Sequence, residues 1–211
     1  MAQFPHNPCA PLADPTLVEA YRSTATPIIS DNLRRLPGAV GLRPFHRGGT
    51  MAGTALTVRT SAGDNLAIHQ ALDLVQPGYV LVVDGGGDTS RALFGEIMTT
   101  IAQFRGAVGL VLDGAVRDAA ALRQSDFPCF ARAAIHRGPF KNGPGEINVP
   151  VTVGGMIVAP GDIVVGDDDG VVAFPQAIAA ELLRAVQAQE VREAEILRSI
   201  REGRYVGAYA K

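Results

Sequence analysis

The residues with the most suggestive chemistry follow a short apolar segment in the middle of the chain. Residues 107–112 read AVGLVL, and Arg117 and Asp118 come shortly after the Asp113 that closes this run. An arginine guanidinium can hold a carboxylate through two parallel hydrogen bonds, and an aspartate is a hard oxygen ligand for Mg²⁺. Aspartate is also a common helix cap, and an arginine at a turn is often solvated. The spacing alone therefore leaves a binding site and an ordinary turn as open interpretations.

A glycine-rich segment after the preceding apolar run offers a second set of ligand-binding groups. Residues 79–83 read YVLVV, and residues 84–98 continue as DGGGDTSRALFGEIM. Glycine-rich backbone that leads into a helix leaves N–H groups free to bind an anion, although a tight turn would also explain the glycines. The segment lacks the G-x-G-x-x-G spacing of dinucleotide sites. We therefore do not expect a nucleotide or S-adenosylmethionine site.

The start of the helix in this segment decides which amides are free. Ser90 could cap a helix that begins at Arg91, or the helix could begin near Gly95 and Glu96. We expect the later start, because a glycine inside a helix costs about 1 kcal/mol relative to alanine. The carboxylate of Glu96 would then lie at the mouth of the pocket. The open amides would be those of Glu96, Ile97 and Met98.

The surrounding sequence predicts a parallel sheet that brings the two candidate segments to one edge. Apolar runs alternate with segments of helical periodicity, an order typical of crossover connections between parallel strands. In such sheets, ligands bind beyond the carboxyl ends of the strands. The predicted strands are 51–60, 79–83, 107–112 and 127–131, and the predicted helices are 64–75, one that ends near 104, and 118–124.

The second half of the chain and the N-terminal segment lack the alternation of strands and helices. After residue 132, short apolar segments are separated by turns such as 160–162 (PGD), which predicts antiparallel hairpins. A long, half-charged helix over 176–202 is typical of an oligomer arm. We expect one α/β domain over 1–211 with an added antiparallel layer. The other predicted parts are an irregular segment 1–15, helices 16–24 and 27–36, loops 37–50 and 136–146, and strands 147–153, 156–159, 162–165 and 171–174.

Composition argues against several classes of protein. The net charge is −2, tryptophan is absent and no cluster of basic residues stands out, so we expect no nucleic-acid partner. Cys9 and Cys129 have no zinc or C-x-x-C spacing and are predicted to be unrelated thiols in a reducing compartment. The sequence contains no apolar stretch of transmembrane length and no signal-peptide pattern at its start. We therefore expect a cytoplasmic protein without a membrane partner.

Together these motifs resemble one known family. The chain is similar to the RraA-like family, which includes the class II 4-hydroxy-4-methyl-2-oxoglutarate / 4-carboxy-4-hydroxy-2-oxoadipate (HMG/CHA) aldolases. The resemblance covers roughly residues 25–205. The matching motifs are 84–88 (DGGGD), 95–96 (GE), 113–118 (DGAVRD), 137–146 (RGPFKNGPGE), 160–162 (PGD) and 167–172 (DDDGVV).

This resemblance implies a fold, an assembly and a metal. The fold would be a three-layer β/β/α swivelling domain with a long C-terminal helix, assembled as a homotrimer or as a dimer of trimers, a homohexamer. The cofactor would be Mg²⁺ or Mn²⁺, and the partner a small 2-oxo acid.

The resemblance also implies roles for individual residues. Asp118 would be the direct metal ligand, and Arg117 would contact the carbonyl and carboxylate of the pyruvyl group. Glu96 falls where the family has an acidic residue that holds metal-bound water, although an aspartate is the usual residue there. The backbone from Gly95 to Met98 would complete the anion pocket. A glutamate from the C-terminal helix of a neighbouring subunit would join the site; Glu193 is our first choice, followed by Glu190 and Glu195.

The activity implied by the resemblance is that of a metal-dependent lyase. Such an enzyme cleaves a 4-hydroxy-2-oxo dicarboxylic or tricarboxylic acid to pyruvate and a second oxo acid, and it also decarboxylates oxaloacetate. The family also contains a non-catalytic regulator of RNase E, which acts by binding another protein. That regulator tends to lack the acidic residue at position 96 and the long terminal helix, so the presence of both here favours the enzyme.

The remaining ionisable residues have ordinary explanations. His69 lies within a predicted helix and is expected to be packed there, and Asp64 is expected to cap the same helix. Asp84 and Asp113 are expected to shape turns, with a supporting role beside the pocket as the alternative. Lys141 lies in a Gly/Pro loop. It could form a Schiff base with a substrate, or it could be a cation beside the distal carboxylate of a substrate.

Overall fold

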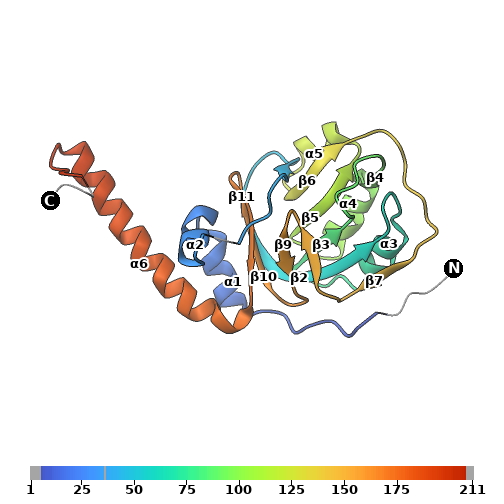
Figure 1. Cartoon of the computed structure of the whole chain (residues 1–211), viewed down its shortest axis with the longest axis horizontal. Helices are drawn as coiled ribbons and strands as arrows, with labels where there is room; N and C mark the ends of the chain where they lie inside the picture. Colours follow the sequence, from blue (N-terminus) through green and yellow to red (C-terminus); the bar gives the residue numbers. More distant parts are fainter. Residues whose placement is uncertain (1–5, 36, 208–211) are drawn as a thin grey trace.

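A twisted mixed sheet forms the body of the protein. The computed structural model describes residues 6–35 and 37–207, and Figure 1 shows this sheet at the centre of the molecule. Four of its strands are parallel and form the predicted β-α-β core: β2 (Met51–Thr60), β3 (Tyr79–Asp84), β5 (Gly109–Val116) and β6 (Cys129–Ala134). The predicted parallel arrangement is therefore confirmed.

Antiparallel strands extend both edges of this core, and one further short strand, β4, pairs parallel with the end of β5. The strand order is β1-β6-β5-β3-β2-β10-β11, and β4 and β7 pair with the ends of β5 and β2. The added strands are β1 (Arg43–Pro44), β4 (Ala92–Phe94), β7 (Gly145–Ile147), β10 (Ile163–Asp167) and β11 (Gly170–Phe174).

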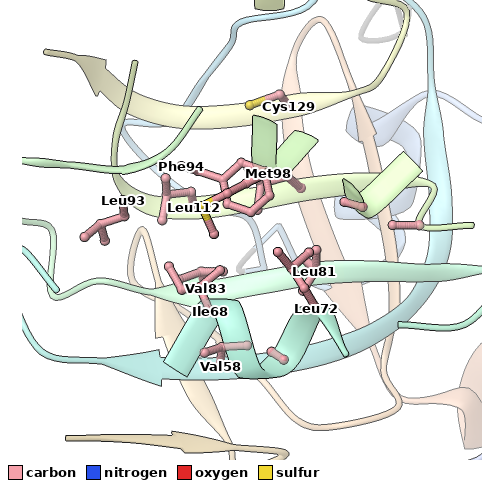
Figure 2. Close-up of a cluster of buried hydrophobic side chains, with 14 of the residues drawn as sticks. Val58, Ile68, Leu72, Leu81, Val83, Leu93, Phe94, Met98, Leu112 and Cys129 are labelled. Atoms are coloured by element: carbon pink, nitrogen blue, oxygen red, sulfur yellow. The ribbon is translucent and has the colours of Figure 1, made fainter. Parts of the chain in front are cut away.

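Helices cover one face of the sheet. Successive side chains of a strand point to opposite faces, so Leu81 and Val83 of β3 pack against the helices, whereas Val80 and Val82 pack on the other side. Figure 2 shows Ile68 and Leu72 lying over Leu81 and Val83 in this helix-facing cluster. The covering helices are α3 (Leu66–Leu72), α4 (Glu96–Phe104) and α5 (Ala119–Gln124).

A small hairpin covers the opposite face. It consists of β8 (Val151–Val153) and β9 (Met156–Val158), whose buried side chains pack against Val80 and Val82. Two aspartates bind it, one at the end of β3 and one within β5: Asp84 Oδ2 accepts from the Thr152 N–H at 3.2 Å, and Asp113 Oδ2 accepts from the Gly154 N–H at 2.7 Å. The molecule thus has the expected three-layer β/β/α arrangement, in which these aspartates attach the hairpin.

The terminal helices form a separate cluster beside β10 and β11. Tyr21 of α1 is buried there and donates its hydroxyl to the carbonyl of Ala179, 2.7 Å away. In Figure 1, α6 leaves this cluster and extends well beyond the body of the molecule. The helices are α1 (Pro15–Arg22), α2 (Thr26–Asn32) and α6 (Gln176–Arg201).

Several local expectations were wrong. Residues 92–94, which the earlier of the two helix starts would have placed in a helix, form strand β4, and the predicted loop 37–50 contains β1. The predicted strand 147–153 is split into β7 and β8, because Asn148 has a left-handed φ of 57° and Pro150 has no N–H to donate. Residues 1–5 of the predicted irregular segment, and Leu36 at the end of a predicted helix, lie outside the described residues. Among the described helices, none combines the length and the apolar character that crossing a bilayer would require.

Candidate active site

Arg117 and Asp118 lie where strand β5 ends, as the sequence predicted, although β5 runs on to Val116. The backbone N–H of Arg117 still donates to the carbonyl of Phe94 in the neighbouring β4, at 2.9 Å. The chain then turns sharply, because Asp118 adopts a left-handed backbone with φ 56°. The Arg117 Nε lies 3.6 Å from Asp118 Oδ2, and both side chains are partly exposed. The turn therefore presents a cation and an anion side by side at the surface.

The carboxylate of Asp118 does not cap its own helix. Asp118 occupies the N-cap position of α5 but makes no side-chain capping bond there. Its Oδ2 instead accepts from the backbone N–H of Glu96 in α4, at 3.0 Å. The ordinary interpretation of this aspartate as a cap for the following helix is therefore wrong. The same bond occupies one of the amides that we had expected to be open.

Gly95 allows this close approach. The helix α4 begins at Glu96 with Gly95 at its N-cap, so the later of the two predicted starts is confirmed. A Cβ atom at residue 95 would lie 2.6 Å from Asp118 Oδ2 and 2.8 Å from Arg117 Cγ. These distances are shorter than carbon contacts allow, so a side chain at this position would displace Arg117 and Asp118.

A cavity of about 290 Å³ opens in front of these residues. Arg117, Gly95, Ile97 and Met98 are among its lining residues. Ile97 and Met98 occupy the first turn of α4, where a helix provides no carbonyl acceptor for the backbone N–H groups. These amides and the guanidinium make this part of the cavity suitable for a carboxylate.

A loop between β6 and β7 forms the opposite wall. Gly138, Pro139 and Lys141 line the cavity from this loop. The buried Asp64 holds the loop, since its Oδ2 accepts from the N–H groups of Asn142 and Gly143 at 2.6 and 3.0 Å. Its Oδ1 accepts from the N–H of Leu66 at 2.9 Å, as expected for a residue at the start of a helix. Asp64 thus joins the start of α3 to the loop that carries Lys141.

Sequence reasoning missed two residues of the cavity wall. Asn65 and His69 both line it from α3 and its N-cap, whereas His69 had been expected to be an ordinary packed residue. Burial lowers the pKa of His69, and the nearby positive charge of Lys141 lowers it further, against an opposing effect of Asp73. Its imidazole is therefore neutral at pH 7. Asn65 donates to the Leu93 carbonyl at 3.0 Å.

A second opening lies on the other side of the guanidinium. It has a volume of about 450 Å³, and Arg117, Asp118 and His136 are among the residues that line it. Arg117 therefore faces both openings, whereas Asp118 faces only this one. The Glu96 side chain is exposed and lines neither of the two, although its backbone N–H contacts Asp118.

Glu193 is not brought to this site within one chain. It lies on the exposed part of α6, where its Oε1 accepts from Gln189 Nε2 at 2.8 Å. Figure 1 shows α6 extending away from the body, and the helices that it contacts most within the chain are α1 and α2. A role for Glu193 at the cavity would therefore require a second subunit.

The chemistry of the donors suits a hard divalent cation held by few protein ligands. Among residues 6–35 and 37–207, no group of three or more His, Cys, Asp and Glu side chains could hold a metal ion. Mg²⁺ is commonly bound by one or two carboxylates and completes its shell with water and substrate oxygens. The exposed carboxylate of Asp118 fits that mode of binding.

The fold and the site define an α/β protein with a cavity beyond the carboxyl ends of its parallel strands. The chain belongs to the RraA-like family, since the pattern of that family, Aldolase/RraA, matches residues 26–173. A curated protein of Halalkalibacterium halodurans is 38% identical over 165 residues, which are 78% of this chain and 79% of the relative. Its name is "Putative 4-hydroxy-4-methyl-2-oxoglutarate aldolase". The resemblance seen in the sequence is thereby confirmed.

Solved structures share the fold. RraAS2 of Streptomyces coelicolor, described as an unusual member of the RNase ES inhibitor RraA protein family, is 27% identical with a TM-score of 0.80, over 88% of this chain and 97% of that one. The RNA-processing inhibitor RraA from Thermus thermophilis is 34% identical with a TM-score of 0.66, over 72% of this chain and 93% of that one. Relatives with this fold thus carry the names of an aldolase and of RNA-processing inhibitors.

Proposed function

We propose that this protein is a divalent-metal-dependent lyase that cleaves a 4-hydroxy-2-oxo acid to pyruvate and a second oxo acid. One observation carries the proposal: Arg117 lines one cavity together with Ile97 and Met98 of the first turn of α4, and the carboxylate of Asp118 lies directly beside the guanidinium. The name of the Halalkalibacterium halodurans relative supports the same reaction. A cavity that can bind an anion, next to an exposed carboxylate, is what a metal-assisted oxo-acid enzyme needs.

Arg117 and the helix amides bind the pyruvyl end of the substrate in this proposal. The guanidinium donates to the carboxylate and to the 2-oxo oxygen, and the N–H groups of Ile97 and Met98 donate to the remaining carboxylate oxygen. The ammonium of Lys141 in the opposite wall pairs with the distal carboxylate. Among the described residues Lys141 has no ion-pair partner, so its charge is available to a ligand.

Cleavage breaks the bond between C3 and C4 of the substrate. The C4 hydroxyl gives up its proton and becomes the carbonyl of the second oxo acid. The electron pair of the broken bond moves into the pyruvyl fragment, whose 2-oxo oxygen becomes negatively charged as an enolate, and a proton added at C3 then yields pyruvate. Arg117 is a fixed cation beside the oxygen on which this charge develops.

Asp118 would hold Mg²⁺ or Mn²⁺ through its carboxylate. When bound, the cation supplies Lewis-acid stabilisation of negative charge on the substrate oxygens. Glu96, exposed at the start of α4, would accept the hydroxyl proton through a water molecule. We propose that Glu193 of a neighbouring subunit joins Glu96 in this task within a homotrimer or homohexamer.

Decarboxylation of oxaloacetate tests the common step, because loss of CO₂ leaves the same pyruvate enolate. We expect pyruvate to form from oxaloacetate and from 4-hydroxy-4-methyl-2-oxoglutarate when Mg²⁺ or Mn²⁺ is present. Chelation by EDTA should stop both reactions, and readdition of the metal should restore them. Coupled lactate dehydrogenase assays measure the pyruvate.

Asp118→Asn tests whether the negative charge of Asp118 is needed to hold the metal. Asparagine tolerates the left-handed backbone at φ 56° and keeps an oxygen that can accept from the Glu96 N–H, but it lacks the negative charge. We expect turnover to fall by at least about 100-fold with an unchanged circular dichroism spectrum, since a divalent cation needs an anionic ligand here. If this variant kept wild-type turnover, Asp118 would not be the metal ligand.

A non-catalytic regulator is the second candidate, because two structural relatives are described as RNA-processing inhibitors. Such a protein would form no pyruvate from either substrate with Mg²⁺ or Mn²⁺ present. It would instead inhibit RNA cleavage by a ribonuclease of the RNase E type in a purified system. Failure of the lyase assays together with such inhibition would replace the proposed function.

A further inference from the structure

A second recess lies beside the cavity, at His69 and Lys141. It has a volume of about 380 Å³, and His69 and Lys141 line both hollows, so the two are neighbours, and the recess lies away from Arg117. Leu66, Leu72 and Ile101 form its apolar walls. We call these three residues, together with the volume between them, the distal recess.

The charges around the distal recess are already compensated, except for one. At its rim, Arg105 donates to Asp73 Oδ1 at 2.7 Å, so these two groups neutralise each other. His69 is neutral at pH 7, because burial and the charge of Lys141 lower its pKa. Lys141 is then the unpaired cation at the junction, with an apolar volume behind it. A ligand that fits must place an anion at the junction and an apolar group in the recess.

We propose that the distal recess binds an alkyl group on C4 of the substrate, so that the preferred substrates are 4-hydroxy-2-oxo dicarboxylic acids whose C4 alkyl group is larger than methyl. This inference rests on the proposed function. With the pyruvyl end at Arg117 and the distal carboxylate at Lys141, the third group on C4 is directed into the recess. The acceptor product released there is a 2-oxo acid with an aliphatic side chain.

The apolar walls also discriminate against a third carboxylate. A carboxymethyl group on C4 would have to leave water for a volume lined by leucine and isoleucine, where the nearby Arg105 is already paired with Asp73. Burial of an unpaired carboxylate is costly, whereas each buried methylene contributes about fourfold to an equilibrium or a specificity constant. The recess therefore favours alkyl dicarboxylic over tricarboxylic substrates.

A series of substrates tests the proposal on the wild-type protein. The substrates are 4-hydroxy-2-oxoglutarates that carry methyl, ethyl or propyl on C4, together with the carboxymethyl compound, assayed with Mg²⁺. We expect kcat/KM to rise by about fourfold for each added methylene and to be lowest for the carboxymethyl compound. A flat or falling series, or a preference for the carboxymethyl compound, would overturn the inference.

Ile101 variants test the location of the alkyl group. Ile101→Phe narrows the recess and should abolish or reverse the rise with chain length, whereas Ile101→Ala enlarges it and should shift the preference toward longer chains. Phe104→Ala is the matched control, since Phe104 lies on the same helix, is 92% exposed and does not line the recess. This control should keep the wild-type series. An unchanged series in both Ile101 variants would mean that the alkyl group lies elsewhere.

The two proposals fail in different ways. If the protein releases pyruvate from oxaloacetate and from the methyl substrate but shows no gain with chain length, only the distal recess is wrong. If it releases pyruvate from none of the substrates with Mg²⁺ or Mn²⁺, the lyase is wrong, and the recess proposal is overturned with it.

Discussion

The site depends on a contact between a glycine and two charged side chains. Gly95 lies against Arg117 and Asp118 so closely that a single added carbon would collide with both, at 2.8 and 2.6 Å. The bond from the Glu96 N–H to Asp118 follows from the same approach. The orientation of the Arg117 guanidinium and the Asp118 carboxylate therefore depends on the absence of a Cβ atom at residue 95.

We predict that Gly95→Ala lowers kcat/KM for oxaloacetate by about 100-fold, because displacing reacting groups by about an ångström has an effect of that size. The control is Gly138→Ala, where the added Cβ would lie 3.6 Å from an Arg117 guanidinium nitrogen, an ordinary contact. This control should lose far less activity. Equal activities of the two variants in a steady-state assay would show that the close approach at Gly95 has no functional consequence.

At the scale of elements, the site is formed by a strand, a helix and a loop that are distant in the sequence. Strand β5 carries Arg117 to the edge of the sheet, α4 begins beside it, and the loop between β6 and β7 covers both. Asp64 attaches that loop to the start of α3 through the N–H groups of Asn142 and Gly143. The cavity therefore has one wall formed by regular structure and one wall formed by a loop, which Asp64 helps to hold in place together with backbone bonds from Asn65 and Ala92.

We predict that Asp64→Ala weakens the wall that carries Lys141. Removal of the carboxylate leaves buried N–H groups without an acceptor, so the free energy of unfolding should fall by about 1–3 kcal/mol, as measured by urea denaturation. KM for a dicarboxylic substrate should rise more than kcat falls, because Lys141 is displaced while Arg117 is not. Asp88→Ala is the control, since the Asp88 side chain accepts from the exposed Ser90 two residues away and does not line the cavity. An unchanged KM in Asp64→Ala would argue against anchoring of the loop by Asp64.

At the scale of the whole molecule, α6 is the feature that a single chain does not explain. Its first half packs on α1 and α2, but its second half projects from the body (Figure 1). Four large apolar side chains are exposed there: Val191, Ile196, Leu197 and Ile200. Three of them, Ile196, Leu197 and Ile200, lie on one side of the helix. This exposed apolar surface favours the proposed assembly, which would carry Glu193 to another subunit's site.

Mixed oligomers test this arrangement. Asp118→Asn and Glu193→Ala are each expected to be inactive, because each lacks one half of every site. After unfolding and refolding at equal amounts, about a quarter of the sites in a cyclic oligomer would combine an intact Asp118 with an intact Glu193 from the neighbour, and about that share of wild-type activity should return. Each variant refolded alone is the control. Mixtures without regained activity would exclude Glu193, and the same mixing with Glu190→Ala and Glu195→Ala would test the other two candidates.

Much of the fold could be predicted, because the long elements carry their own periodic signal. The apolar runs of β2, β3 and β5 and the crossover helices between them were recognised from the sequence. The shorter strands were missed or merged. The three residues of β4 are recognisable as a strand only through their pairing with the end of β5, a contact that no local pattern encodes.

By itself, the sequence determined the parallel α/β core, the start of α4 at a glycine, and the places where Arg117 and Asp118 follow a strand. These features depend on periodicity and on the conformational preferences of single residues, which act locally. Only the tertiary structure decided that Asp118 binds α4 instead of capping α5, and that Asn65, His69 and Lys141 share a cavity with Arg117. Those relations join residues far apart in the chain, and they are set by how the helices and the loop pack on the sheet.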